Sequence, residues 1–144
     1  MTTDSIEFAA PDAAPDVYAF FASPAGTPQE TPVDLRAYAA QVRWRKETGG
    51  ITVGNAPIAT DRESQSLING LWVSTQVTPA ITVQFKTSAG YVPLSAAQIQ
   101  TIAAAVHAHA QACRSVEGGL DAAITAGTVT TTAQVDQAFA AVTV

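Results

Sequence analysis

ITVGNAPIATDRESQSLING, residues 51–70, decides the fold of this chain. Its first half alternates apolar and polar residues around the Gly54-Asn55 pair, which suits the two-residue turn of a β-hairpin. In its second half, Thr60 and Glu63 have the spacing of a capping box, in which each side chain bonds the backbone N–H of the other residue. The stretch therefore predicts a hairpin followed by a helix over about residues 61–71.

The same order of elements is predicted a second time. Residues 81–86 alternate cleanly, residues 87–90 form a turn, and residues 91–94 return as a short or edge strand because Pro93 cannot donate a ladder hydrogen bond. Ser95 and Gln98 then form a second capping box. It opens a long, alanine-rich helix that we predict over residues 96–117, before Gly118-Gly119 interrupts it and a short segment resumes.

Two further helices are expected at the ends of this region. Thr31 is suited to the N-cap and Pro32 to the first position of a helix that runs to the left-handed cap Gly49-Gly50. Thr131 or Thr132 can cap a final helix over residues 132–142. The fold class is thus α+β, in which two short β-hairpins form a small antiparallel sheet packed with three to four helices, including the long one. This domain is expected to occupy residues 33–144.

The N-terminal segment, residues 1–32, differs from the rest in composition. It contains five prolines, which break long helices and central strands, and it holds acids but no basic residue. It also holds the aromatic residues Tyr18, Phe20 and Phe21, which are rare in disordered tails. We interpret the segment as an extended arm that packs on the main body or on a neighbouring subunit, the alternative being an ordinary solvated terminus.

Composition excludes several classes of function. The 144 residues carry a net charge of −5, which argues against nucleic acid as a partner because phosphate binding requires clustered Lys and Arg. A single cysteine rules out an intrachain disulfide and a cysteine-based zinc site. We expect no membrane insertion, since no apolar run is long enough, and no secretory signal, so synthesis in the cytoplasm is expected.

The candidate chemistry is sparse. His109 and Cys113 are four apart on the predicted helix, the spacing of a Cys–His nucleophile or a transition-metal site. An alanine-walled helix face supplies neither an oxyanion donor nor an orienting carboxylate, so we interpret His109 as a packed histidine with one hydrogen bond. His107 and His109 are two apart and point to different faces. We therefore predict no catalytic, cofactor-binding or metal-binding residue.

Two blocks of the sequence resemble an uncharacterised domain family of tailed bacteriophages and prophages. The first block is an Arg-rich helix ending in glycine (residues 43–50), a hairpin (residues 51–59) and an Asp-x-x-Ser-Gln helix start at Asp61. The second is an aromatic-x-x-Leu-x-Ala-x-Gln turn that begins at Tyr91 and enters the long helix. The resemblance covers about residues 36–126.

The resemblance implies a structural, non-enzymatic component of a phage tail, at the tail tip, the baseplate or the fibre attachment. Its partners would be other tail proteins, and it would be located in the virion tail after synthesis in the host cytoplasm. The alternative is a tail-fibre assembly chaperone that the virion does not retain. An enzyme acting on host-surface sugar would need a carboxylate pair, whereas the acids here cluster in the arm and at helix caps.

Self-association is predicted from the pattern of the long helix. Its apolar residues recur at spacings of three and four, and the alanines between them allow another helix to approach closely. A symmetric homo-oligomer, for which a trimer is plausible, would follow. The predicted subunit contacts, from the arm and from this stripe, are Tyr18, Phe20, Phe21, Ile99, Ile102, Val106, His109 and Cys113.

Overall fold

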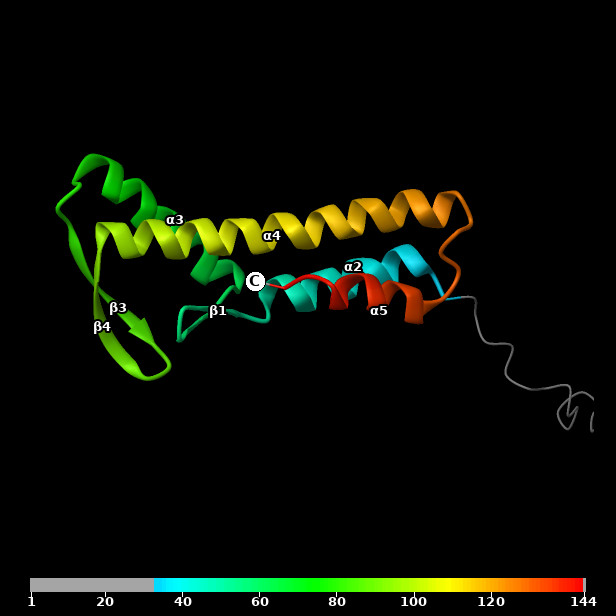
Figure 1. Ribbon diagram of the computed structural model, residues 1–144, viewed down its shortest axis with the longest axis horizontal. Helices are drawn as coiled ribbons and strands as arrows, with labels where there is room; N and C mark the ends of the chain where they lie inside the picture. The colour runs from blue at the N-terminus through cyan, green and yellow to red at the C-terminus, as the bar shows by residue number, and fades with distance from the viewer. Residues whose placement is uncertain (1–32, 144) are drawn as a thin grey trace, which may run out of the picture. The chain divides into compact units, whose positions relative to one another are not determined.

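The computed structural model describes residues 33–143, and the part from Asp34 onward forms one compact unit. The arm predicted over residues 1–32, with Tyr18, Phe20 and Phe21, lies outside the described residues. Within them the chain is α+β, as predicted (Figure 1). Its elements are α2 (Leu35–Thr48), β1 (Ile51–Val53), β2 (Ala56–Ile58), α3 (Arg62–Val77), β3 (Thr82–Thr87), β4 (Gly90–Ser95), α4 (Ala96–Thr125) and α5 (Thr132–Ala140).

Both predicted hairpins are present, but they do not join into one sheet. In the first hairpin Val53 pairs with Ala56 across the predicted two-residue turn, where Gly54 has a φ of 63°. The strands β3 and β4 pair separately, from Thr82 with Ser95 to Thr87 with Gly90. Each hairpin is a two-stranded sheet of its own. One physical reason lies in the first hairpin, whose strands have three residues each and whose β2 contains Pro57, which has no N–H to donate.

Two predicted helix starts are shifted. Helix α2 begins at Leu35, and its N-cap is Asp34, whose carboxylate accepts hydrogen bonds from the N–H groups of Arg36 and Ala37. Thr31, the predicted cap, lies outside the described residues. Helix α3 is capped by Asp61, whose carboxylate accepts from the Ser64 N–H at 3.0 Å. The predicted capping box of Thr60 is wrong, because the Thr60 hydroxyl is used elsewhere.

Two helices extend beyond their predicted ends. Helix α3 continues past Gly70 to Val77, and α4 continues through Gly118-Gly119 to Thr125. Neither glycine of the pair has a positive φ. Packing outweighs the weak helix propensity of glycine here, because Leu120 is buried immediately after the pair. The predicted capping box of α4 is confirmed at Ser95 with Gln98, and of the two caps predicted for α5 the structure uses Thr131, which forms a capping box with Gln134.

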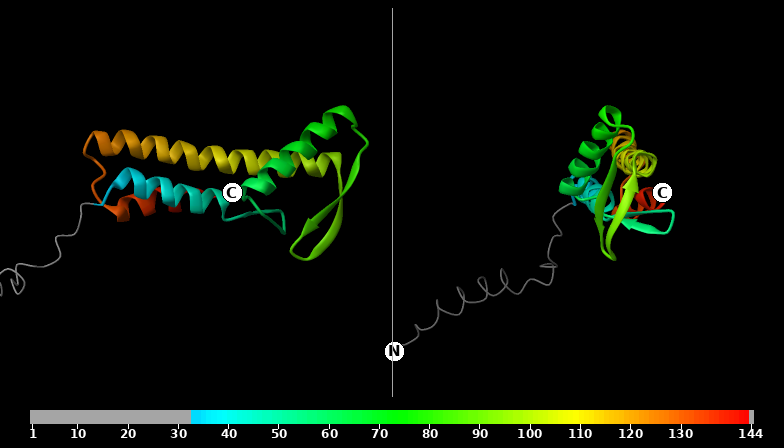
Figure 2. Two further views of the ribbon diagram at one scale, coloured as in Figure 1. Left: turned by 180° about the vertical axis from the view of Figure 1, so that it is seen from behind. Right: turned by 90° about the vertical axis from the view of Figure 1, so that its left-hand side faces the viewer.

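Helix α4 connects two separate clusters of buried apolar side chains. Its N-terminal half packs against α3 and the hairpins, and its C-terminal half packs against α2 and α5 (Figures 1 and 2). The first cluster contains Ile51, Ile58, Ile68, Leu94, Ile99, Ile102 and Val106. The second contains Ala39, Cys113, Leu120, Val135, Phe139 and Val142. We call the N-terminal half of α4, together with α3 and the two hairpins, the hairpin half. The C-terminal half of α4, together with α2 and α5, is called the helical half.

Candidate functional site

The predicted apolar stripe of α4 is real, but it forms the core of the chain. Ile99, Ile102 and Val106 lie in the buried cluster of the hairpin half, and Cys113 lies in that of the helical half. His109 is buried between them. Because α2, α3, α5 and the hairpins already cover these side chains, they present no surface to a second copy in this structure. The sequence pattern identified the buried face correctly, and contact of these residues with a second copy stays a prediction.

The His109–Cys113 pair has the geometry of a structural contact. His109 Nε2 lies 2.8 Å from the carbonyl oxygen of Lys46, so this nitrogen carries the hydrogen and donates it. Cys113 Sγ is 3.9 Å from the same nitrogen, which therefore has no free lone pair to accept the thiol proton. Burial raises the pKa of the Cys113 thiol, and the nearby Glu47 carboxylate adds to this rise. These features oppose a reactive thiolate.

A buried carboxylate, Glu47, forms the centre of a charge cluster between the two halves. Its side chain is 0% exposed, and its Oε2 lies 2.6 Å from Arg43 Nη1. Its Oε1 lies 2.9 Å from Arg62 Nη1 and 3.2 Å from Arg114 Nη2. Helices α2, α3 and α4 each supply one arginine. A second carboxylate, Glu117, lies 2.6 Å from Arg43 Nε.

The arginines decide the protonation of Glu47. Burial alone raises the pKa of a carboxyl group. Here the hydrogen bond from Arg43 and the charges of Arg62 and Arg114 outweigh burial, and the pKa of Glu47 is lowered below its ordinary value. Glu47 is therefore an ionised structural acid at neutral pH. An acid that donates a proton in catalysis needs a raised pKa, which Glu47 does not have. Its contacts with Arg43, Arg62 and Arg114 instead suit the cluster to joining three helices.

The C-terminal end of α2 is closed by side chains from the rest of the chain. The buried Thr60 hydroxyl donates to the Glu47 carbonyl at 2.7 Å and accepts from the Gly50 N–H at 2.8 Å. His109 binds the Lys46 carbonyl, as described above. These bonds satisfy carbonyl groups that have no partner within the helix. Gly50 has a φ of 89°, which confirms the predicted left-handed cap.

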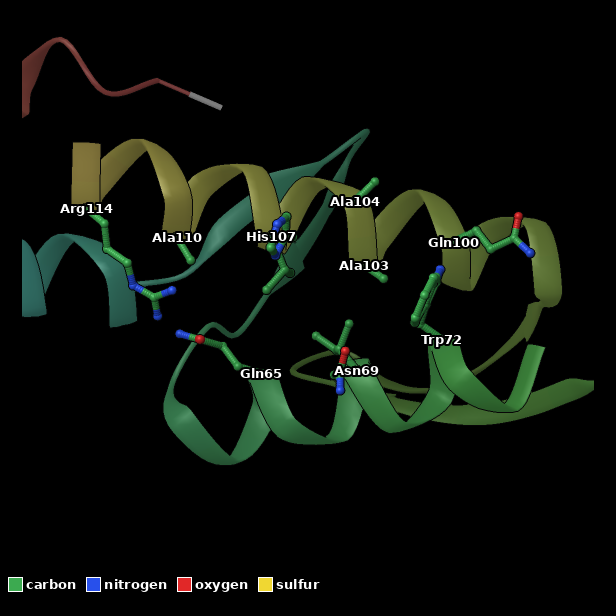
Figure 3. A pocket seen from close by; sticks show the side chains of 11 residues that line it. Gln65, Asn69, Trp72, Gln100, Ala103, Ala104, His107, Ala110 and Arg114 are labelled. Atoms are coloured by element: carbon green, nitrogen blue, oxygen red, sulfur yellow. The ribbon is translucent and has the colours of Figure 1, made fainter. Parts of the chain in front are cut away.

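An open groove lies between α3 and the N-terminal two thirds of α4 (Figure 3). Its volume is about 530 Å³, within the size range of ligand sites. The residues that line it are Gln65, Ile68, Asn69, Trp72, Gln100, Ala103, Ala104, Val106, His107, Ala110 and Arg114. Its apolar part consists largely of alanines, the buried Ile68 and Val106, and one indole ring.

The polar groups of the groove lie along both helices. Amide side chains come from Gln65, Asn69 and Gln100, and the guanidinium group of Arg114 lies at one end. In Figure 3 the side chains of Gln65 and Arg114 point toward one another across the groove. Since Arg114 also binds Glu47, the groove ends at the charge cluster.

Large exposed apolar side chains also lie in the hairpin half. Trp72 is 42% exposed and Val77 is 80% exposed, both on α3. Other members of this set are Leu67, Val73, Tyr91 and Val92, while Trp44 belongs to α2. Arg62 covers one face of the Trp44 ring, with its guanidinium carbon 4.9 Å from the ring centroid.

Sequence reasoning missed both the groove and the charge cluster. In the sequence, Arg62 is a charged residue that caps no helix, and Glu47 is one residue of an arginine-rich helical turn. Neither pattern indicates that the two side chains meet. Their shared position depends on how α2, α3 and α4 pack, which no spacing along the chain reveals. Within residues 33–143, no group of three or more His, Cys, Asp or Glu residues could hold a metal ion. No helix in that part has the length and apolar character needed to cross a bilayer.

These features first define a class, an α+β domain in which one long helix joins a closed helical half to an open hairpin half. The chain belongs to the family described as "Domain of unknown function (DUF4376)", whose model matches residues 30–142. No curated protein and no solved structure matches the chain. The match contains both sequence blocks of the resemblance. The family description states no function, so the link to phage tails is a proposal.

Proposed function

We propose that the chain is a non-enzymatic structural component of a bacteriophage tail, located at the tail tip, the baseplate or the fibre attachment. It acts by binding other tail proteins and further copies of itself. The observation that carries the binding role is the open groove between α3 and α4, accompanied by exposed apolar side chains such as Trp72 and Val77. Exposed apolar surface of this kind marks contact sites when it is concentrated in one region.

The charged groups support binding over catalysis. The best-built cluster encloses its central carboxylate completely and pairs it with three arginines. Asp34 and Asp61 cap helices, and Asp121 pairs with Arg36 at 2.6 Å. The tail assignment rests on the two sequence blocks. In the structure their residues form the α2 cap, the first hairpin, the α3 start and the turn into α4.

Mass spectrometry of purified particles tests the proposal, using the tailed phage whose genome encodes the chain. The protein should be present at a fixed ratio to the other tail proteins, and it should remain after washing in high salt. Its absence from complete particles, together with fibres that fail to assemble when its gene is deleted, would favour an assembly chaperone instead. Normal particles after deletion would contradict both roles.

A further inference from the structure

We propose that the groove between α3 and α4 receives Asp16–Phe21 of a second copy of this chain. The segment reads DVYAFF and combines one acid with three aromatic side chains. This contact gives a molecular basis to the self-association in the proposed function and rests on that part of it. It does not depend on the phage tail.

Charge complementarity is the first argument. The seven basic residues of the chain lie between Arg36 and Arg114, and seven acids lie in the same described part. The net charge of −5 therefore comes entirely from the acids before residue 33. Arg114 at the end of the groove and Arg62 of the same charge cluster have side chains that are each 47% exposed, whereas Glu47 is 0% exposed. The cluster thus presents two partly exposed arginine side chains to solvent, and their charge complements an acidic segment.

The shape and chemistry of the groove provide the second argument. Ala103, Ala104 and Ala110 leave space above α4, and Trp72 offers an indole ring at the far end from Arg114. Aromatic side chains stack on such a ring and bury large area with few rotatable bonds. The amide of Asn69 lies along the same groove, where it can bond the backbone of an extended segment. The groove therefore has an arginine at one end and an aromatic ring at the other. The segment matches it, with an acid at one end and aromatic side chains at the other.

The third argument concerns reach. Thirteen residues separate Phe21 from Leu35, the first residue of α2. An extended chain covers at most about 3.5 Å per residue, so this linker spans roughly 45 Å. The 30 residues of α4 are also about 45 Å long. A segment on one copy can therefore reach the groove of an adjacent copy at many relative positions.

The contact is heterologous, because the groove and the segment are different surfaces. Such contacts build closed rings when the rotation between copies closes, and filaments when it does not. The buried stripe of α4, by contrast, would have produced a symmetric helix interface. A cyclic oligomer such as a trimer is consistent with the groove contact. Each copy then uses one groove and one segment.

Complementation between two full-length variants tests the contact. In Ala104→Glu an acid replaces an exposed alanine of the groove, and in the double variant Phe20→Ser, Phe21→Ser the segment loses two aromatic rings. Light scattering should show an oligomer for the unaltered chain and monomers for each variant alone. An equimolar mixture of the two should form a 1:1 dimer, because one intact segment then meets one intact groove. Dimer formation also shows that both variants are folded.

The matched control is Ala108→Glu, which places the same acid on an exposed part of α4 outside the groove. It should assemble like the unaltered chain. Three results would overturn the inference: an unaltered chain that is monomeric at every concentration, a groove variant that assembles normally, or a mixture of variants that stays monomeric. If the protein were absent from particles but the mixture formed dimers, the tail role would fail and the groove contact would stand.

Disulfide trapping separates contacts between copies from contacts within one copy. Copies carrying Phe20→Cys are mixed with copies carrying Ala104→Cys and oxidised, while the native Cys113 is fully buried and does not compete. A covalent dimer that joins the two variants is expected, and a mixture with Ala108→Cys should give far less. Equal yields from both mixtures would contradict the contact. A further variant carries both Phe20→Cys and Ala104→Cys in one chain. If the disulfide formed only within such single chains, the assignment of the contact to a second copy would be contradicted.

Discussion

The two halves of α4 are covered to different extents. In the helical half, α2 and α5 pack over the helix and bury Cys113, Val135 and Phe139 almost completely. In the hairpin half, α3 and two separate hairpins leave a groove and several exposed apolar side chains, among them Trp72 and Val77. One continuous helix therefore carries a closed core at one end and an incomplete one at the other.

We infer from this difference that the helical half mainly provides stability and the hairpin half mainly provides a binding surface. Buried side chains in a closed core contribute to the free energy of unfolding and have no surface for a partner. An open groove contributes less to that free energy and can take an occupant. The charge cluster at Glu47 lies at the junction, where it fixes α2, α3 and α4 relative to one another. Four substitutions test this division.

The largest loss of stability is expected for Phe139→Ala in the helical half. Phe139 is 2% exposed, and its removal leaves a cavity between α5 and its neighbours. Such truncations cost about 3–5 kcal/mol. Urea unfolding monitored by circular dichroism measures the change. A cost below about 1 kcal/mol would show that this half is not closely packed.

The second effect is expected for Glu47→Gln. Three arginines then lose a charge partner, and breaking a buried pair costs about 3 kcal/mol. The exposed Glu63→Gln on α3 is the matched control and should change the free energy of unfolding by less than about 0.5 kcal/mol. Equal effects of the two substitutions would contradict the structural role of the cluster.

The same residue predicts a dependence on pH. The pKa of Glu47 is lower in the folded chain than its ordinary value of 4.5. Its stabilisation is therefore complete above that value and is lost as the pH falls through the lowered folded pKa. The unaltered chain should lose more stability between neutral and acid pH than Glu47→Gln does. Urea unfolding at a series of pH values gives both curves.

A smaller effect of opposite sign is expected for Gly118→Ala. The position is helical, and an added Cβ would meet no atom within 4 Å. Replacing a helical glycine by alanine should stabilise the chain by about 0.5–1 kcal/mol. Gly127→Ala is the contrasting case, because its φ of 76° is strained for alanine and predicts destabilisation. Destabilisation by Gly118→Ala would instead support the helix break that the sequence suggests.

Only a modest loss of stability is expected for Trp72→Ala in the hairpin half. Its ring is 42% exposed, so the cost should stay near 1 kcal/mol, well below that of Phe139→Ala. Assembly measured by light scattering should be lost nevertheless, since the ring lines the groove. A large loss of stability, or assembly that is unaffected, would break the distinction between the two halves.

Local signals predicted most of the secondary structure. The turn at Gly54, the capping box at Ser95 and the cap at Thr131 depend on residues three or fewer positions apart, and the structure has all of them. The cap at Thr60 failed because this hydroxyl bonds the end of α2 instead. A contact across ten or more residues outweighed the local pattern. The helix break predicted at Gly118-Gly119 was wrong for a similar reason, because packing on both sides of the pair maintains the helix.

The candidate site could not be predicted in the same way. The heptad spacing of α4 showed which face is apolar, but a spacing does not say whether that face is covered by the same chain or by another copy. Glu47 and Arg114 are 67 residues apart, and they meet only after α2 and α4 pack. The groove similarly arises from small side chains on α4 and polar ones on α3, whose approach is a property of the tertiary structure.

Hydrogen exchange of the full-length chain, measured by mass spectrometry at low and high protein concentration, tests the central division most directly. Assembly should increase protection of backbone amides in α3 and in residues 96–110 of α4. The amides of α5 should exchange at the same rate at both concentrations, because the helical half is already closed. Increased protection confined to α5, or spread evenly over both halves, would contradict the assignment of binding to the hairpin half.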